Sequence, residues 1–158
     1  MNVLVTGGAG YVGAAAVRAL VAAGHEVWIY DNLSQGHAAA VPGALRQAQR
    51  LIVGQLHNVR LLVETLTEAR IEAVLHFAGL AYVGESVVDP AKYYHHNVGG
   101  SMTLLEAMRT AGVGKMVFSS STATYGVPRQ IPIVESEAQR PINPYGFTKL
   151  VVERMLAD

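Results

Sequence analysis

Apolar positions along the chain follow two spacings, one typical of buried strands and one typical of helices. The short apolar run 2–5 ends at glycines, as a buried strand of a parallel sheet does. The alanine-rich segment 14–23 has helical spacing, and Gly24 suits the position that follows a helix C-terminus. Asp89 and Pro90 are typical of a helix start, because proline fits the first helical turn. The pattern predicts strands at 2–5, 26–30, 50–53, 73–77 and 115–119, and helices at 14–23, 59–69, 89–110 and 143–158.

Strands that alternate with helices predict an α/β fold, in which crossover helices join the strands of a parallel sheet. The length of 158 residues fits one domain, 1–158. Apolar residues make up 51% of the chain, which is enough to build one buried core.

Composition narrows the classes of partner. Lysine plus arginine balances aspartate plus glutamate, 12 against 12, so nothing points to nucleic acid or to an acidic membrane surface. The chain has no cysteine, which excludes a disulfide framework or a thiolate metal site and suits a reducing cytoplasm. The six histidines lack metal-ligand spacing, so we expect no metal. Glycines interrupt the apolar N-terminal segment, which does not have the pattern of a signal peptide or membrane span.

A glycine-rich turn lies between the first predicted strand and the first predicted helix. Gly7 permits a tight turn, Gly10 lets the backbone approach a pyrophosphate, and Gly13 lets the helix pack on the strand. The helix N-terminus adds free N–H groups and a positive dipole end. Three glycines alone are weak evidence, because many turns need glycine.

Asp31 strengthens the case for a dinucleotide. It stands at the end of the second predicted strand, about 20 residues after the turn, where a carboxylate can accept hydrogen bonds from both ribose hydroxyls. The same charge would repel a 2′-phosphate, so it favours NAD over NADP. The alternative is that Asp31 only caps the turn 31–34.

Tyr145 and Lys149 stand four residues apart on the last predicted helix and therefore share a face. An ammonium group beside a phenol favours the phenolate, and such a tyrosine can take a proton from a sugar hydroxyl. Hydroxyl partners are plentiful after the preceding strand, within 119–124. Taken alone, a tyrosine–lysine pair at this spacing arises often by chance.

Together these segments resemble the extended short-chain dehydrogenase/reductase family and, within it, the UDP-glucose 4-epimerases. The resemblance extends over the whole chain and implies a doubly wound parallel Rossmann sheet with helices on both faces, truncated at about five strands and lacking a substrate domain. It is carried by 5–13 (VTGGAGYVG), 31–34 (DNLS), 76–79 (HFAG), 83–86 (VGES), 97–98 (NV), 118–121 (FSSS), 134–136 (VES) and 144–149 (PYGFTK).

The resemblance implies roles for individual residues. Ser121 would hydrogen-bond the reacting sugar hydroxyl, Tyr145 would act as acid and base, and Lys149 would tune Tyr145 and hold the nicotinamide ribose. The implied reaction interconverts UDP-glucose and UDP-galactose by transient oxidation at C4 with bound NAD. The implied cofactor contacts come from Gly7, Gly10, Tyr11, Val12, Gly13, Asp31, Asn32, Ser34, Gln55, Leu56, Phe77, Ala78, Gly79, Asn97, Ser119, Tyr145 and Lys149.

Two segments separate this chain from its relatives. Dehydratases and decarboxylases of the family carry a carboxylate just after the serine, whereas 122–125 (TATY) has none, which favours epimerisation. The family usually places an acidic residue against adenine after the third strand, and this chain has Gln55 and Leu56 there. We expect Gln55 to accept from the adenine amino group as a neutral amide, and to bind it more weakly.

Members of that family are longer, and this chain stops soon after Lys149. We therefore expect NAD binding with little or no turnover and weak nucleotide-sugar binding, because orientation supplies much of the barrier reduction. The strand 115–119 would become an open edge. A homodimer or higher oligomer would form through the two long helices, whose expected exposed apolar residues are Leu104, Leu105, Met108, Leu150 and Val151.

Three interpretations remain open at this point. The chain is an epimerase or another sugar-nucleotide oxidoreductase or dehydratase of the family, a non-catalytic NAD-binding module, or a structural Rossmann domain with an empty pocket. NAD-dependent thermal stabilisation separates the third from the first two.

Overall fold

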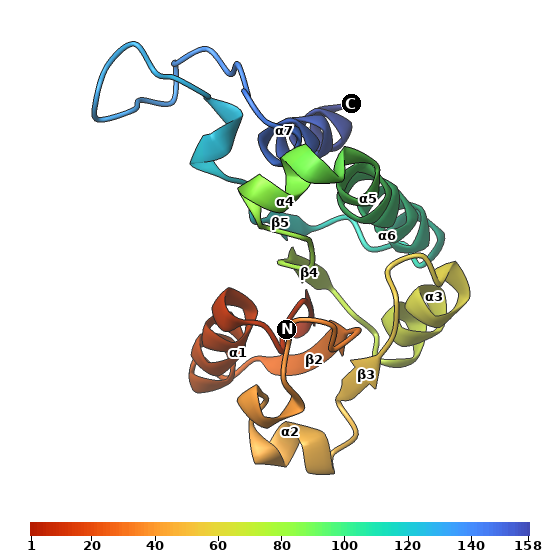
Figure 1. Cartoon of the computed structure of the whole chain (residues 1–158). Coiled ribbons are helices and arrows are strands. Elements are labelled where there is room, and N and C mark those ends of the chain that lie inside the picture. Colours follow the sequence, from red (N-terminus) through yellow and green to blue (C-terminus); the bar gives the residue numbers. More distant parts are fainter. The chain divides into compact units, whose positions relative to one another are not determined.

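The computed structural model describes residues 1–158, which divide into two compact units (Figure 1). The sheet unit comprises 1–78 and 103–119, and the helical unit comprises 79–102 and 120–158. The assignment of 1–158 to a single NAD-binding domain stays a prediction.

The sheet unit is built on one five-stranded parallel sheet, in the order β3-β2-β1-β4-β5 (Figure 1). This order is that of a Rossmann sheet, in which the chain begins in the middle and winds outward in both directions. The predicted fold class is confirmed. The strands are β1 (Asn2–Thr6), β2 (Glu26–Asp31), β3 (Leu51–Val53), β4 (Ala73–His76) and β5 (Met116–Phe118).

Alternate residues of the strands face two separate cores. Val5 and Ile29 point to the face covered by α1 (Tyr11–Ala22) and the short α2 (Gly43–Gln47). Leu4 and Val74 point to the opposite face, covered by α3 (Val59–Glu68) and by the part of α6 (Gly100–Thr110) that belongs to the sheet unit. Both faces are therefore buried, which explains why the strand segments read as continuous apolar runs.

The burial of α6 corrects one expectation. Leu104 and Met108 are not exposed; they belong to the same core cluster as Leu62 and Leu66 of α3. Because α6 covers a sheet face, its apolar stripe packs into the core of its own chain. The other three residues expected to be exposed, Leu105, Leu150 and Val151, are half-buried.

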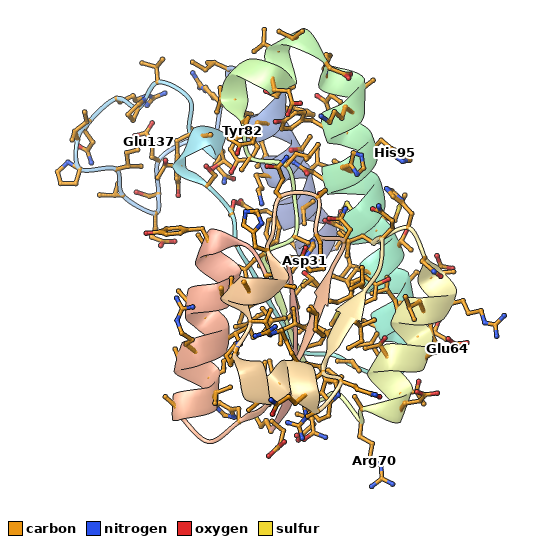
Figure 2. The ribbon with its side chains drawn as sticks, turned by 60° about the horizontal axis from the view of Figure 1, so that its bottom comes forward. Asp31, Glu64, Arg70, Tyr82, His95 and Glu137 are labelled. Atoms are coloured by element: carbon orange, nitrogen blue, oxygen red, sulfur yellow. The ribbon has the colours of Figure 1, made fainter.

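A cationic side chain covers the outer part of β2. The guanidinium of Arg50 lies 4.5 Å from the centre of the Trp28 ring and forms an ion pair with Glu26. Glu64 and Arg70 stand on α3 and just after it, and both side chains project into solvent (Figure 2).

The helical unit consists of short helical pieces and one long helix. The predicted helix 89–110 consists of α5 (Pro90–Tyr93), the π-helical segment η2 (Tyr94–Gly99) and α6. The side chain of Asp89 accepts the Lys92 N–H at 3.1 Å and so begins α5. The remaining elements of this unit are α4 (Val83–Val88), the 3-10 turn η3 (Thr122–Thr124) and α7 (Pro144–Ala157). None of the helices combines the length and the apolar character that a membrane crossing requires.

Candidate functional site

Two glycines of the turn are required by the packing of the chain itself. Gly7 has φ +71°, and a Cβ there would lie 2.6 Å from the Ala78 nitrogen. A Cβ on Gly13 would lie 2.1 Å from the Gly7 carbonyl oxygen, so the first turn of α1 packs directly on the glycine loop. Any side chain at either position would force the backbone apart.

Gly10 is less constrained by the chain than Gly7 and Gly13. Its φ is −81°, which every residue can adopt, and a Cβ would meet only the Gly7 carbonyl oxygen, at 3.3 Å. The space beside it opens at the N-terminus of α1, where Tyr11 is 97% exposed. The first N–H groups of a helix have no partner within it and form a ready site for an anion.

Asp31 joins the end of β2 to the glycine turn (Figure 2). One carboxylate oxygen accepts the Ala9 N–H at 3.0 Å, and the other accepts the Leu33 N–H at 2.8 Å. The side chain is only 7% exposed. Asp31 therefore caps the turn 31–34, as the alternative interpretation of this residue required. Each oxygen still keeps a lone pair for a further donor, such as a ribose hydroxyl.

The end of β3 is tied to the end of β2. The Tyr30 hydroxyl donates to the Gln55 carbonyl oxygen at 2.9 Å, and burial raises the pKa of Tyr30 to about 12. Asn32 Nδ2 donates to Gln55 Oε1 at 3.0 Å. Leu56 packs against the core cluster that contains Leu62. Gln55 itself is exposed and its backbone is fixed.

A buried polar pair lies between β1 and β4, where the winding of the sheet reverses. Thr6 Oγ1 lies 2.6 Å from His76 Nδ1, and both residues are almost fully buried. Phe77 packs against the core on the α1 side, and the Ser119 N–H donates to the His76 carbonyl oxygen at 3.1 Å. Sequence reasoning missed this pair; its only signal was a polar residue at the end of each apolar strand.

In the helical unit, Lys149 lies beside Tyr145 inside the protein. Lys149 Nζ is 5.9 Å from the centre of the Tyr145 ring, and the two residues are 6% and 9% exposed. Burial lowers the pKa of Lys149 to about 8, because a charged ammonium is costly away from water. Its neutral and charged forms are thus both accessible near neutral pH.

The start of α7 is held against the segment that contains Ser121. Asn143 Oδ1 accepts the Gly146 N–H at 2.8 Å and caps the helix. A Cβ on Gly146 would lie 2.4 Å from the Ala123 carbonyl oxygen, so α7 approaches η3 closely at this glycine. Ser121 begins η3, and its Oγ accepts the Ala123 N–H at 3.1 Å. The fold therefore brings η3, which Ser121 begins, against the first turn of α7.

Two further side chains position Tyr145, and the sequence pattern assigned neither of them to the site. Ser86 Oγ accepts the Tyr145 N–H at 3.1 Å. The Tyr93 ring packs edge-on against the Tyr145 ring, with the ring centres 6.5 Å apart.

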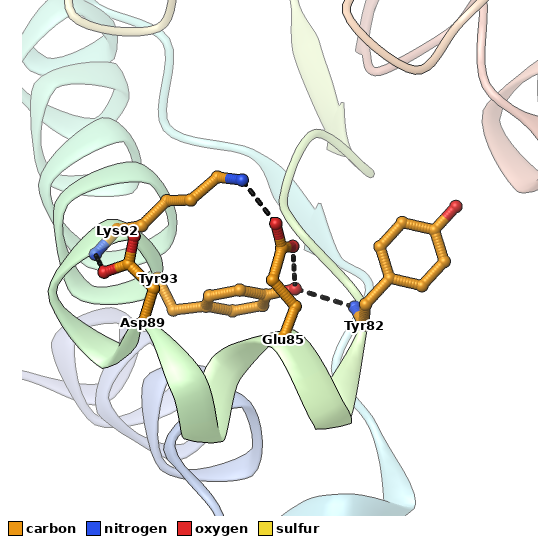
Figure 3. A network of polar contacts seen from close by, with 5 residues as sticks. All are labelled: Tyr82, Glu85, Asp89, Lys92 and Tyr93. Carbon is orange, nitrogen blue, oxygen red and sulfur yellow. Dashed lines mark hydrogen bonds and ion pairs between the residues drawn. The ribbon is translucent and has the colours of Figure 1, made fainter.

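Tyr93 is in turn held by Glu85, within the network shown in Figure 3. The Tyr93 hydroxyl donates to Glu85 at 2.8 Å and accepts the Tyr82 N–H at 3.0 Å. Burial and, as the next largest cause, the hydrogen bond to Glu85 raise the pKa of Tyr93 to about 12. Hydrogen bonds from Lys92 and Tyr93 lower the pKa of the Glu85 carboxyl. The phenol therefore remains a hydrogen-bond donor at neutral pH.

Asn97 uses its side chain inside the protein. Its amide forms a pair of hydrogen bonds with the backbone of Leu80, at 2.8 and 3.0 Å, and also donates to Thr148 at 3.1 Å. A Cβ on Gly79 would lie 3.2 Å from Asn97 Oδ1 and 3.8 Å from Lys149 Nζ. Asn97 thus fixes the segment that passes closest to the lysine.

The predicted site residues divide between the two units, and no cluster of histidine, cysteine, aspartate or glutamate could hold a metal ion. The sheet unit contains Gly7, Gly10, Tyr11, Val12, Gly13, Asp31, Asn32, Ser34, Gln55, Leu56, Phe77, Ala78 and Ser119. The helical unit contains Gly79, Asn97, Ser121, Tyr145 and Lys149.

Known proteins resemble the chain along nearly its whole length. A UDP-glucose 4-epimerase of Streptomyces lividans is 52% identical over 153 residues, which are 97% of this chain and 46% of that protein. The crystal structure of a UDP-glucose 4-epimerase from Brucella ovis in complex with NAD has a TM-score of 0.94 and 52% identity, and the match covers 99% of this chain and 47% of the other. A Stenotrophomonas maltophila UDP-glucose 4-epimerase with bound NAD and formylated UDP-arabinopyranose gives a TM-score of 0.92 and 43% identity, covering 100% and 48%.

The chain thus spans about half the length of the relatives it matches, and it corresponds to their N-terminal portion. Residues 3–158 match the family described as the NAD dependent epimerase/dehydratase family. With the parallel sheet, the glycine turn and the tyrosine–lysine pair in place, the chain belongs to that family and, within it, groups with the UDP-glucose 4-epimerases.

Proposed function

We propose that this chain binds NAD through the glycine turn and Asp31 of the sheet unit. The observation that carries the proposal is that a Cβ on Gly10 would meet only one atom of the chain, the Gly7 carbonyl oxygen at 3.3 Å, at the exposed N-terminus of α1. A dinucleotide pyrophosphate at the N-terminus of α1 explains the glycine there, and Asp31 keeps lone pairs for the ribose hydroxyls. Two of the related crystal structures contain NAD, which supports the same cofactor here.

The remaining implied contacts belong to the same proposal. Asn32, Ser34, Gln55 and Leu56 would face the adenosine half. Phe77, Ala78, Gly79, Asn97 and Ser119 would line the cofactor, and Tyr145 and Lys149 would contact its nicotinamide half.

The chemistry that the chain could perform on a sugar hydroxyl rests on Ser121, Tyr145 and Lys149. When bound, NAD would supply the hydride acceptor. Tyr145 would take the hydroxyl proton and later return it, with Ser121 holding the same oxygen. Lys149 would tune Tyr145 and hold the nicotinamide ribose, and its lowered pKa lets Lys149 exist in both the charged and the neutral form near pH 8.

We infer that the reaction type is 4-epimerisation of a UDP-hexose, with UDP-glucose and UDP-galactose as the pair. No carboxylate follows Ser121 in 122–125, which argues against dehydration or decarboxylation. The chain alone would turn this substrate over poorly, because it spans about half of its relatives and orientation supplies much of the rate. The alternative is a non-catalytic NAD-binding module. Cytoplasmic location belongs to the same proposal.

Thermal unfolding with and without dinucleotide tests the cofactor assignment. NAD at 100 times its dissociation constant should stabilise the fold by about 2.7 kcal/mol, a shift of several degrees. NADP should shift the transition much less, because Asp31 repels a 2′-phosphate. Asp31→Asn keeps the shape of the side chain and should reduce the preference for NAD. Equal shifts with both dinucleotides in the unaltered chain, or no shift with either, would contradict the proposal.

A further inference from the structure

Three polar side chains link the ends of β2 and β3 in one line of hydrogen bonds. Asn32 Oδ1 accepts from the Ser34 N–H at 3.0 Å and from the Ser34 hydroxyl at 2.7 Å. A backbone N–H can only donate, so the oxygen of the Asn32 amide must point toward Ser34. The NH₂ group of Asn32 therefore points the other way, toward Gln55.

This orientation fixes the amide of Gln55 as well. Asn32 Nδ2 donates to Gln55 Oε1 at 3.0 Å, so the Gln55 oxygen lies on Asn32 and its NH₂ group faces away. The backbone beneath it is held by two bonds, because the Gln55 carbonyl oxygen accepts from the Tyr30 hydroxyl and from the Asn58 N–H, each at 2.9 Å. Gln55 thus presents a hydrogen-bond donor from a fixed position.

Gln55 lies where the base of a bound dinucleotide would reach. In a sheet of this order the pyrophosphate lies at the end of β1 and the ribose at the end of β2. The next strand outward is β3, and Gln55 follows β3 directly. Asn32, to which Gln55 is bonded, is the neighbour of Asp31.

We propose that this chain recognises the purine of its dinucleotide through the amide N–H of Gln55. The Gln55 amide would donate, and an acceptor nitrogen on the edge of the base would receive, the hydrogen bond. This inference rests on the proposed NAD binding. It reverses the expectation that Gln55 would accept from the adenine amino group. A carboxylate at this position could only accept hydrogen bonds. Here the hydrogen bonds that link Ser34, Asn32 and Gln55 (the relay) turn the NH₂ group of Gln55 toward the base.

A dinucleotide whose base has no N–H on that edge tests the polarity. The dinucleotide of nicotinamide and unsubstituted purine keeps the N1 acceptor and carries hydrogen in place of the 6-amino group, while NAD offers both the amino donor and the N1 acceptor. A protein donor can bond to either base, and a protein acceptor can bond only to adenine. The dissociation constants of the unaltered chain for the two dinucleotides should therefore agree within about threefold. The loss of one hydrogen bond can change a dissociation constant by more than this.

Two variants should reverse the polarity by different routes. Gln55→Glu replaces the donor by an acceptor of the same shape. Asn32→Asp leaves Gln55 untouched but accepts from both neighbours, so the Gln55 amide turns and presents its oxygen. Each should shift the ratio of dissociation constants toward NAD by about three- to tenfold.

Asn58→Asp is the matched control. It adds the same charge to the sheet unit and keeps an acceptor for the Leu61 N–H, but it does not enter the relay. It should leave the ratio unchanged. All four proteins are compared by titration calorimetry, with each melting temperature measured alone to confirm folding.

Two results would overturn the inference and leave NAD binding intact. One is a tenfold or greater preference of the unaltered chain for NAD. The other is a ratio that Asn32→Asp fails to change. Binding of neither dinucleotide would instead overturn the proposed function together with this inference.

Discussion

At the scale of single residues, two glycines of one turn have different roles. Gly13 allows the contact between α1 and the loop, whereas a Cβ on Gly10 would meet only the Gly7 carbonyl oxygen, at 3.3 Å. Gly13→Ala should therefore cost about 1–3 kcal/mol of folding free energy without any ligand, because its Cβ would strike a backbone oxygen.

Gly10→Ala should leave the stability of the ligand-free chain within about 0.5 kcal/mol of the original, and should weaken NAD binding by a factor of ten or more. Urea unfolding and calorimetry measure the two effects separately. An alanine at position 10 that left NAD affinity unchanged would show that the space beside Gly10 is not where the pyrophosphate binds.

Lys149 makes stability depend on pH in a defined direction. Its folded pKa of about 8 lies below its ordinary value of 10.5, so between these values the unfolded chain holds a proton that the folded chain has lost. Stability should rise with pH over this window, by about 2 kcal/mol between pH 8 and 9.5. Above pH 10 it should fall again, because Tyr30 and Tyr93, with pKa values of about 12, stay neutral only when folded.

Lys149→Met should flatten the rise between pH 8 and 9.5. Lys115→Met removes an exposed lysine and should leave the rise in place. Urea unfolding of the ligand-free chain at several pH values distinguishes the two variants; a rise of equal size in both would mean that another group causes it.

At the scale of elements, the cap of α7 connects folding to the site. Asn143→Ala removes the acceptor of the Gly146 N–H and should cost about 1 kcal/mol, whereas Asn143→Asp keeps an acceptor and should cost much less. The first turn of α7 carries Tyr145, so the alanine variant should also increase hydrogen exchange at 144–148. Equal exchange in the two variants would show that the cap does not hold this turn.

The elements that the sequence predicted well are the ones with continuous apolar runs. All five strands lie within one or two residues of their predicted bounds, because burial on both faces leaves an unbroken apolar segment. The helices α2 and α4 escaped prediction because five or six residues are too few to show a helical period.

Side-chain burial was harder to predict than element type. From the sequence, Leu104 and Met108 were expected to be exposed on one face of a helix. Only the structure shows that they pack into the core of the sheet unit. The glycine turn, Asp31, Tyr145 and Lys149 were predicted from local spacing. Ser86 and the pair of Thr6 and His76 were not, because each depends on a partner distant in the sequence.

At the scale of the whole molecule, we expect self-association through the two long helices. With Leu104 and Met108 buried, the candidates are the residues still exposed: Met102 on α6 and Phe147 on α7 are 59% and 45% exposed, and Tyr94 packs edge-on against Phe147 with ring centres 6.3 Å apart. Light scattering at micromolar concentration should give a dimer or larger species, and Phe147→Glu should yield monomer. Monomer alone in the unaltered chain would contradict this expectation.

Turnover is the second property of the whole molecule. A coupled assay with UDP-galactose should give little or no product even with saturating NAD, because much of the rate depends on substrate orientation. Tyr145→Phe provides the baseline, since it removes the proton-transferring hydroxyl. Activity of the unaltered chain far above this baseline would show that the chain alone is a competent enzyme.

Trp28, the residue on which Arg50 stacks, is also a spectroscopic probe. Trp28 is the only tryptophan of the chain, and it lies in the sheet unit. Its fluorescence therefore reports the unfolding of that unit alone, while far-ultraviolet circular dichroism reports the helices of both. Coincidence of the two transitions is the standard sign that a protein unfolds in one step. A single indole thus makes the cooperativity between the unit that carries the glycine turn and the unit that carries the tyrosine–lysine pair directly measurable, with no label added.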